Sequence, residues 1–348
     1  MKRFLLKSLL YSIPIITPIV LFTIFINPHL HGDIGPLGYI TFADDYGKYN
    51  LPTNNKVVNC EYNYNNFSDS CILIIGDSFS QTNIASISYN YFLANYTNYN
   101  VVNLSQQCYT VSPFTRFMYF SKTRRLPKIV ILETVERRMV ERLCKLTLSQ
   151  SAETMLTIHH VDTTIGTNNN SKNKTIFEKT QEYIKRNLHV SGYDNPIKSS
   201  ALNKACFTCA DKESSLYFYE DDVNQLPMSD SLLNLAIIKL DSLYAYTNSL
   251  GIELYVLIAA DKYDVYQDYI VDNPYPQQNV LERFYAMYPH PRIINSKDTL
   301  SQMIANDVMD VYWCNNTHWS PIGSKAVAEQ LAKTINRCEN DTIFSIKQ

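Results

Sequence analysis

A serine and a histidine stand in two segments of this chain that could do nucleophilic chemistry together. Ser78 follows the apolar run of residues 71–76 in the segment CILIIGDSFSQ, and His318 lies in YWCNNTHWSPIG near the other end of the chain. A serine hydroxyl becomes a nucleophile when an imidazole within hydrogen-bond reach takes its proton. The two segments therefore predict acyl transfer through an ester on Ser78, with His318 as the general base.

The residues around Ser78 suit a site at the end of a buried strand. Gly76 permits a sharp turn, and Ser78 is expected where a helix begins, with backbone N–H groups and the positive helix end around its oxygen. Such groups stabilise the oxyanion of a tetrahedral adduct. Gly-Asp-Ser is also an ordinary turn composition, so the segment indicates a nucleophile only together with the histidine.

His318 is expected on a loop that follows the last strand and reaches the same edge of the sheet. Ser320 can cap the helix that comes next, with Pro321 at the first helical position, where its missing N–H costs nothing. Trp319 could act as a hydrophobic staple ahead of this cap. A lone loop histidine usually has a surface or packing role, and the pairing with Ser78 is what makes His318 the predicted base.

The elements that must position these residues form an α/β pattern. Predicted strands, apolar on both faces, are residues 71–76, 100–104, 127–133, 252–259 and 292–295. Predicted helices are residues 80–95, 113–122, 231–249 (capped by Asp230 and followed by Gly251), 279–287 and 320–336. This alternation predicts a three-layer α/β sandwich with a central parallel sheet. Ligands of such sheets bind beyond the carboxyl ends of the strands, near the reversal in strand order.

The first residues, 1–30, are expected to form one membrane-spanning helix. Three basic residues precede an uncharged, mostly apolar stretch from about Leu9 to Ile26, which at about 1.5 Å per residue nearly crosses a hydrocarbon core of about 30 Å. The positive flank predicts a cytoplasmic N-terminus, with residues 31–348 as an outward-facing α/β domain. A cleaved signal peptide is the alternative.

An irregular insertion is expected at about residues 144–227, read as a decorating lobe or long loop. The chain has 8 cysteines, an even number that suits an exported domain. Cys206 and Cys209, in CFTC, are compatible with a disulfide or with free thiols. No second motif of metal ligands accompanies them, so neither a metal nor a cofactor is predicted.

Composition bounds the remaining possibilities. With 348 residues, 45% of them hydrophobic, the chain can bury one sizeable core. Its formal net charge of -2 offers no basic face to a polyphosphate backbone. Nucleic acid is therefore excluded as the expected partner.

Four blocks of the sequence together resemble the SGNH hydrolase superfamily, and within it the alginate O-acetyltransferase-like members. GDSFS is similar to the nucleophile block, and VYWCNNTHWSPIGSKAVAEQLA is similar to the histidine block. PKIVILETVERR resembles a third-strand block, and AADKYDVY resembles a block after the fourth strand. The resemblance covers about residues 71–142 and 230–336 and implies an SGNH or flavodoxin-like sheet.

The chain departs from this family at several points. The histidine block comes after the serine block, whereas it precedes it in the familiar alginate enzymes. The Asp expected two residues before the histidine is Asn316, whose amide oxygen can hold the ring but cannot neutralise an imidazolium. Asn315 is not a carboxylate either, and Asp310 is a remote substitute whose simpler role is a solvated loop charge. The second-block glycine is replaced near Gln107 and Cys108, and no Gly-x-Asn-Asp block exists.

The resemblance implies a serine-dependent O-acetyltransferase for an exported or cell-surface polysaccharide. Ser78, His318 and Asn316 would form the catalytic set, with oxyanion donors from Ser78 and from Asn103 or Cys108. Candidates for binding the sugar are Glu133, Arg137, Lys262, Tyr266 and Trp319. A Glu-Arg pair after a strand is also a common brace of the fold. The resemblance further implies an acetyl donor presented by a multispanning membrane acyltransferase, and a periplasmic or extracellular domain.

Two other functions fit the same residues. A carbohydrate acetyl esterase of this fold would pass the acyl group to water. A non-catalytic glycan-binding or scaffold subunit would keep the fold without the chemistry, and Asn316 in place of the acid favours this reading.

Overall fold

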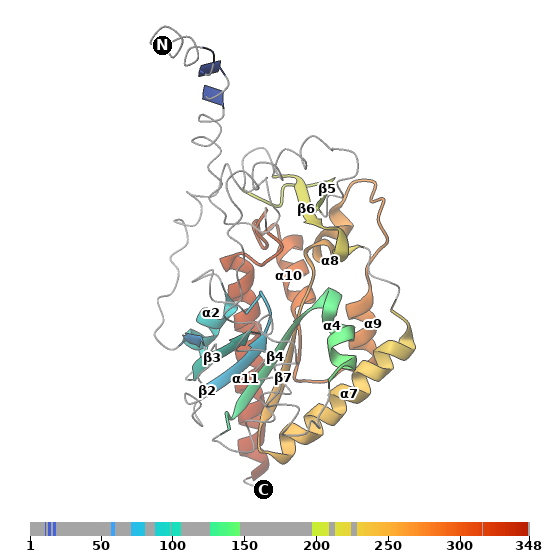
Figure 1. The fold of residues 1–348 in the computed structure, drawn as a ribbon. Helices are drawn as coiled ribbons and strands as arrows, with labels where there is room; N and C mark the ends of the chain where they lie inside the picture. Colours follow the sequence, from blue (N-terminus) through green and yellow to red (C-terminus); the bar gives the residue numbers. More distant parts are fainter. Residues whose placement is uncertain are drawn as a thin grey trace, which may run out of the picture.

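The computed structural model describes residues 11, 13–14, 17–18, 57–59, 71–80, 88–97, 99–105, 126–146, 197–208, 213–223, 228–314 and 316–346. Within this part, a 6-stranded sheet with the strand order β1-β3-β2-β4-β7-β8 forms the centre of the fold (Figure 1). Its strands are β1 (Val57–Asn59), β2 (Cys71–Gly76), β3 (Asn100–Ser105), β4 (Ile129–Val135), β7 (Glu253–Ala259) and β8 (Ile293–Asn295). All of its pairings are parallel, which confirms the predicted α/β class.

The strand order reverses at β2, which places the serine segment at the expected site. The chain passes from β2 to its neighbour β3 on one side, and then crosses to β4 on the other side. Without β1, this is the flavodoxin-like order, in which ligands bind beyond the carboxyl ends of the strands at the reversal. Here those ends are Gly76 of β2 and Val135 of β4.

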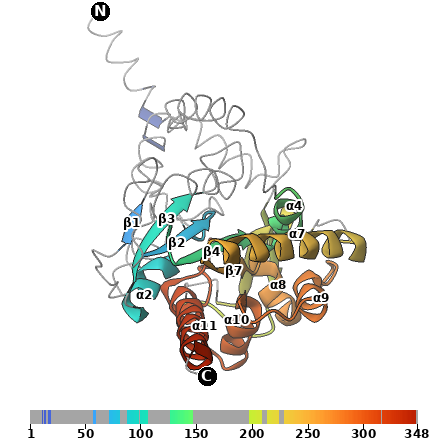
Figure 2. The ribbon, with the colours of Figure 1, turned by 90° about the horizontal axis from the view of Figure 1, so that it is seen from below.

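Helices cover both faces of the sheet. They are α2 (Tyr89–Tyr96), α4 (Glu136–Cys144), α7 (Asp230–Ser249), α8 (Lys262–Tyr266), α9 (Val280–Met287), α10 (Ser296–Ala305) and α11 (Pro321–Ile346), with short 3-10 helices η4 (Glu220–Asp222) and η5 (Gln267–Tyr269). Helix α11 packs against α2 and α10, whereas α4 packs against α7. Figure 2 shows α2, α10 and α11 along one face of the sheet.

The ends of the helices follow the sequence in part. Ser320 caps α11 as predicted, because its Oγ accepts from the N–H of Ile322 at 3.0 Å. Gly251 follows α7 with φ of 71°. The predicted cap of α7 is wrong by one residue, since Ser229 Oγ accepts from the N–H of Leu232 at 3.3 Å. The sequence analysis did not predict α4, α8 or α10.

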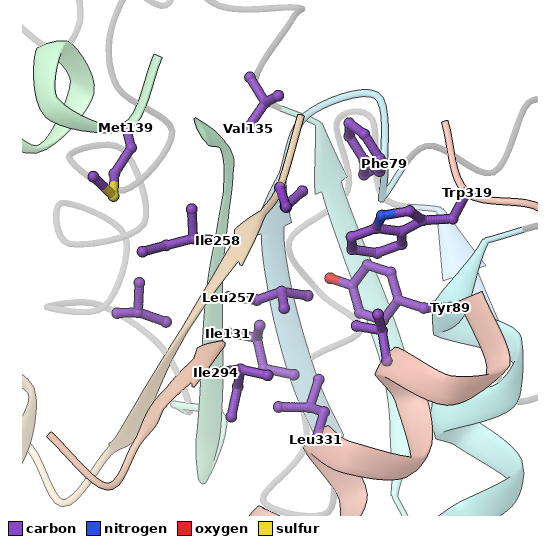
Figure 3. Close-up of a cluster of buried hydrophobic side chains, with 14 of the residues drawn as sticks. Phe79, Tyr89, Ile131, Val135, Met139, Leu257, Ile258, Ile294, Trp319 and Leu331 are labelled. Carbon is purple, nitrogen blue, oxygen red and sulfur yellow. The ribbon is translucent and has the colours of Figure 1, made fainter. Parts of the chain in front are cut away.

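The core explains the apolar strands. All residues of β2 and of β4 are buried, because helices pack on both faces. Figure 3 shows Phe79, Trp319 and Tyr89 packed together at the carboxyl-terminal part of the sheet, with Leu331 of α11 nearby. Burying a large apolar side chain of this kind contributes about 1.5 to 3 kcal/mol. The aromatic cluster therefore fixes the serine segment and the histidine segment to the same core.

The described part of the predicted insertion packs into the core. Its described residues form a 2-stranded antiparallel sheet of β5 (Ile197–Ala201) and β6 (Ser215–Tyr219). Leu216 and Phe218 of β6 belong to the same buried cluster as the central sheet. This pair of strands is therefore an extension of the α/β domain.

Two predicted elements lie outside the described residues: the helix 113–122 and nearly all of the membrane segment 1–30. None of the helices in the part of the chain that the structure describes combines the length and hydropathy needed to cross a bilayer.

Candidate active site

Ser78 lies in a turn directly after β2. The N–H of Ser80 donates to the carbonyl of Asp77 at 3.0 Å, so Ser78 and Phe79 are the central residues of a β-turn. Ser78 is half-buried, while the residues on either side of it are buried. The sequence placed Ser78 at the start of a helix; the structure places it in this turn, and the next described helix, α2, begins only at Tyr89. Residues 81–87 lie outside the description.

Asp77 ties this turn to β4 and α4. Its Oδ2 accepts from Arg142 at 2.6 Å and from the N–H of Val135 at 3.2 Å, and its Oδ1 accepts from the N–H of Phe79 at 3.3 Å. Burial pushes the pKa of Asp77 upward, but the hydrogen bond from Glu133 and the charge of Arg142 outweigh burial and hold that pKa below its usual value. Asp77 is therefore an ionised brace of the turn.

Ser80 anchors the other end of the turn. Its Oγ donates to Glu133 Oε2 at 2.8 Å and lies 3.0 Å from the hydroxyl of Tyr89. Its carbonyl accepts from the side-chain amides of Asn90, at 2.8 Å, and of Asn103. Asn103 was predicted as an oxyanion donor, but in the structure its amide donates to this carbonyl and supports the turn.

Gly76 is needed because neighbouring side chains approach its backbone closely. A Cβ at this position would overlap Ser80 Oγ and Glu133 Oε2. Among the described glycines, only Gly251 has a positive φ. The absence of a side chain at Gly76 thus serves packing, whereas the sequence analysis had explained it by a sharp turn.

His318 lies in a short hairpin ahead of α11. Tyr312 and Trp319 form an isolated antiparallel bridge, and the N–H of Trp313 donates to the carbonyl of His318 at 3.2 Å. Gly323, in the first turn of α11, lets the helix approach this hairpin, because a Cβ there would overlap the carbonyl oxygen of Val311. The loop that carries the histidine is therefore closely packed on the start of α11.

Asn316 orients the imidazole of His318. Its Oδ1 lies 3.0 Å from the backbone nitrogen of His318 and 2.6 Å from ring atom Nδ1. Because a backbone N–H can only donate, the shared acceptor must be the amide oxygen, and Nδ1 must then carry a proton. The neutral ring therefore has its lone pair on Nε2, the atom that acts as general base in a Ser-His pair.

Phe79 brings the serine turn and the histidine loop together. The centroid of its ring lies 4.7 Å from that of His318 and 4.7 Å from that of Trp319. Figure 3 shows Phe79 beside Trp319. Ser78 precedes Phe79 in the turn, so the turn that carries the predicted nucleophile packs against the loop that carries the predicted base.

Lys262 supports the histidine loop from below. Its Nζ donates to the carbonyls of Trp313, at 2.7 Å, and Cys314, at 3.0 Å, and lies 5.0 Å from the ring centroid of Phe207. Its side chain is buried, with 1% exposure. The sequence suggested that Lys262 lines a sugar cleft, but an ammonium buried against two loop carbonyls instead holds the loop in place.

The buried side chains of Tyr266 and Trp319 both form hydrogen bonds with Tyr312, at the start of the histidine loop. Tyr266 accepts from the N–H of Tyr312 at 3.4 Å, and Trp319 donates from Nε1 to the hydroxyl of Tyr312 at 2.9 Å. Tyr312 in turn donates to the carbonyl of Ala260 at 2.7 Å. The sequence suggested that both residues bind the sugar, and the structure buries both side chains. Trp319 also packs against the ring of Phe79.

Arg137 and Glu133 occupy different environments. Arg137 is partly buried and pairs with Asp261 and, at 3.3 Å, with Asp222. Burial lowers the pKa of Arg137, but these two carboxylates outweigh burial and raise it. Glu133 is fully buried under the serine turn. The two residues therefore do not pair with each other as a Glu-Arg brace.

The other sequence candidates are placed as follows. Asp310 is buried and accepts from the N–H of Thr208 at 2.9 Å, so the expectation of a solvated loop charge is wrong. Cys108 and Asn315 lie outside the described residues. Cys206 is a free thiol, which excludes a bond to Cys209, while Cys314 is disulfide-bonded. No group of three potential metal ligands occurs among the described residues.

Sequence reasoning missed most of the residues that support the turn. Asp77 and Ser80 are in the quoted GDSFS segment but were given no role of their own, and Arg142 and Asn90 were not singled out. A second serine two positions after the nucleophile is a signal that could have pointed to the anchor. Nothing in the sequence alone distinguishes Arg142 from the other basic residues of α4.

The comparisons with known proteins agree with the resemblance seen in the sequence. Residues 217–343 match the family model ALGX, described as SGNH hydrolase-like domain, acetyltransferase AlgX. The matched span contains Lys262, Tyr266 and the loop of Asn316 and His318, and Ser78 lies before it. No curated protein matches the chain. Residues 217–343 are thus similar to the SGNH hydrolase-like domain of the alginate O-acetyltransferase AlgX, the family that the sequence blocks predicted.

Proposed function

We propose that this protein transfers an acyl group, in the simplest case acetyl, through Ser78 to a hydroxyl of a polysaccharide. One observation carries the proposal: Phe79, next to Ser78, packs on the ring of His318, whose Nδ1 is held by Asn316. The match to an acetyltransferase family supports acetyl as the group. A turn that presents a hydroxyl beside an oriented imidazole suits covalent acyl transfer.

In the proposed mechanism, His318 Nε2 takes the proton of Ser78 as the serine oxygen attacks the carbonyl carbon of the acyl donor. The adduct collapses to an ester on Ser78, and the leaving group of the donor receives the proton from His318. A sugar hydroxyl then loses its proton to His318 and attacks the ester carbonyl. The bond between the acyl carbon and Ser78 Oγ breaks, His318 gives the proton to Oγ, and the sugar ester is released. The N–H of Ser78 and the loop after β3, where Cys108 stands, would hold the oxyanion.

The partners and the location belong to the same proposal. The acceptor would be an exported or cell-surface polysaccharide, and a multispanning membrane acyltransferase would present the acetyl donor. Residues 1–30 would anchor the domain on the outer side of the membrane, in the periplasm or at the cell surface. The sequence of this segment and the family resemblance support these parts.

The experiment compares glycan acetylation by the unmodified protein and by Ser78→Ala. Acetylation should be lost in Ser78→Ala, because the attacking oxygen is gone. Ser249→Ala is the matched control, since Ser249 lies exposed at the end of α7, and it should acetylate at the original rate. Full acetylation by Ser78→Ala contradicts the proposal.

A non-catalytic role is the second candidate, and Asn316 at the position of the acid favours it. A serine-directed phosphonate separates the two, because it modifies only an activated serine. Labelling of Ser78 supports an enzyme, and an unlabelled protein supports a scaffold. Hydrolysis by the same residues is distinguished by the acceptor: an esterase releases acetate whether or not glycan is present, whereas the transferase forms the glycan ester.

A further inference from the structure

Glu133 contacts both ends of the turn that carries Ser78. Its Oε2 accepts from the N–H of Asp77 and from the hydroxyl of Ser80, each at 2.8 Å. Asp77 and Ser80 flank Ser78 and Phe79, so one buried carboxyl oxygen links the two ends of the turn. The side chain is fully buried at the carboxyl end of β4, next to the strand that delivers the serine.

The environment of Glu133 favours a protonated carboxyl group. Its Oε2 accepts from the N–H of Asp77 at 2.8 Å, so the side chains of two acidic residues lie close together in a buried site, where two negative charges repel each other. Arg142 pairs with Asp77 at 2.6 Å and favours the ionised form of that residue. Burial, and then the negative charge of Asp77, raise the pKa of Glu133 well above its usual value. Glu133 is therefore the member of the pair whose protonated form is favoured.

Among the described residues, the titratable groups near this pair come from α2, from α4 and from the residue before α8, where Asp261 and its partner Arg137 act on Asp77 through their charges. From α2, the fully buried hydroxyl of Tyr89 reaches Ser80, and burial followed by the charge of Glu133 raises the pKa of that tyrosine well above its usual value. From α4, Arg142 contacts Asp77. From β3, the group that contacts the turn is the neutral amide of Asn103.

We propose that Glu133 is a positioning residue that keeps the Ser78 turn in its reactive conformation only while its carboxyl group is protonated. This inference rests on the proposed acyl transfer at Ser78. Loss of the proton puts a second negative charge beside Asp77 in a buried site. Asp77 accepts from the N–H of Phe79, and Phe79 packs on His318. Repulsion between the two carboxylates therefore shifts Asp77. This shift displaces Ser78 and also the ring of Phe79, which packs on His318.

The variant Glu133→Gln tests the ionisation of the Glu133 carboxyl group separately from its hydrogen bonds. The amide oxygen can accept from Asp77 and Ser80 as the acid does, and the amide N–H can donate to the Asp77 carboxylate, but the amide cannot ionise. Glu133→Leu keeps a buried side chain and removes all of these bonds. Glu141→Gln, on the exposed side of α4, is the matched control for the loss of a glutamate.

The first measurement is the rate of phosphonate labelling of Ser78 between pH 5 and 10, with the folded fraction checked by circular dichroism. The unmodified protein and Glu141→Gln should lose labelling rate at alkaline pH. Glu133→Gln should label at neutral pH within about threefold of the unmodified protein and should not show the alkaline loss. Glu133→Leu should label roughly 10 to 100-fold more slowly, as expected for buried donors left unpaired.

The second measurement is the urea midpoint of unfolding across the same range. A carboxyl group whose pKa is raised by folding contributes stability that is fully present below its unfolded pKa, roughly pH 4 to 5, and is lost as the pH rises toward the folded value. The difference in stability between Glu133→Gln and the unmodified protein should therefore grow as the pH rises above that range. Glu141→Gln should show no such growing difference.

The outcomes distinguish this inference from the proposed function. If Glu133→Gln keeps the alkaline loss of labelling, or if its midpoint follows that of the unmodified protein at every pH, the role of the Glu133 proton is overturned. If the unmodified protein is never labelled, the proposed function fails, and with it the catalytic part of this inference. The midpoints then still decide whether Glu133 holds the proton in the folded protein.

Discussion

Asn316 Oδ1 lies 2.6 Å from ring atom Nδ1 of His318 and 3.0 Å from the backbone nitrogen of the same residue. One acceptor thereby fixes the loop conformation and the tautomer of the ring. In a Ser-His-Asp site, a carboxylate at this position also stabilises the imidazolium that forms during the reaction. Asn316 supplies the orientation without that charge, and the first prediction follows from this difference.

Replacing Asn316 by Leu should lower the rate of Ser78 labelling by roughly 10² to 10⁴-fold, because the ring loses the acceptor that sets its tautomer. Asn316→Asp keeps an acceptor and adds a charge that stabilises the imidazolium, so its rate should equal or exceed that of the unmodified protein. Labelling kinetics at neutral pH measure both. Equal rates for Asn316→Leu and the unmodified protein would show that Asn316 does not orient His318.

Lys262 supports the histidine loop through the carbonyls of Trp313 and Cys314. Lys262→Met keeps an apolar side chain near Phe207 and removes the donor to two loop carbonyls, at a cost of about 1 to 3 kcal/mol. The loop should shift, and labelling of Ser78 should fall by at least roughly tenfold. Lys239→Met, on α7 away from the loop, is the control. A labelling rate that is the same in both variants contradicts the supporting role.

Gly76 should tolerate no side chain. In Gly76→Ala, the new Cβ overlaps Ser80 Oγ and Glu133 Oε2, so the fold should lose about 3 kcal/mol or more as these groups are displaced. Gly251→Ala is the comparison, because its Cβ meets open space and the cost of its positive φ is only about 1 to 2 kcal/mol. Denaturant unfolding of both variants measures the difference, and a smaller loss at Gly76 than at Gly251 contradicts the close packing.

Phe79 should matter for rate as well as for stability. Phe79→Leu removes the ring contact with His318, and we expect a roughly tenfold slower labelling of Ser78 from the misplaced base. Phe284→Leu, a fully buried aromatic in α9, should lose a similar stability of about 1.5 kcal/mol without slowing the labelling. If the two variants react equally fast, the contact of Phe79 with His318 has no role in the reaction.

Sequence analysis located the elements whose burial or capping can be inferred from residues adjacent in the sequence. The runs at residues 71–76, 127–133 and 252–259 are apolar on both faces, so their place in a covered parallel sheet follows from composition alone. The start of α11 follows from adjacent Ser and Pro residues. The contact between the serine turn and the histidine loop, through Phe79, agrees with the prediction that both segments lie at one edge of the sheet, although the unpredicted α10 separates the histidine loop from β8.

The errors concern residues whose environment is set by distant parts of the chain. The carbonyls near residue 313 accept hydrogen bonds from Lys262, which allows its charge to be buried. The sequence alone shows only a polar residue after a strand, so Lys262 was assigned to a cleft. Glu133 was given the same role, although it is buried under the serine turn, where burial raises the pKa of its carboxyl group. The cap of α7 was placed on Asp230 because Ser229 and Asp230 are both good caps, and only backbone geometry selects Ser229.

The most direct test of the central claim is detection of an acetyl ester on Ser78. The protein is incubated with an activated acetyl ester in the absence of glycan, quenched in acid and mapped by peptide mass spectrometry. We predict one acetyl group on the peptide that contains Ser78, lost when glycan acceptor is added before the quench, and absent from His318→Ala. Acetylation of the glycan at the full rate by His318→Ala, with no acetyl group on Ser78 in either protein, would contradict the account.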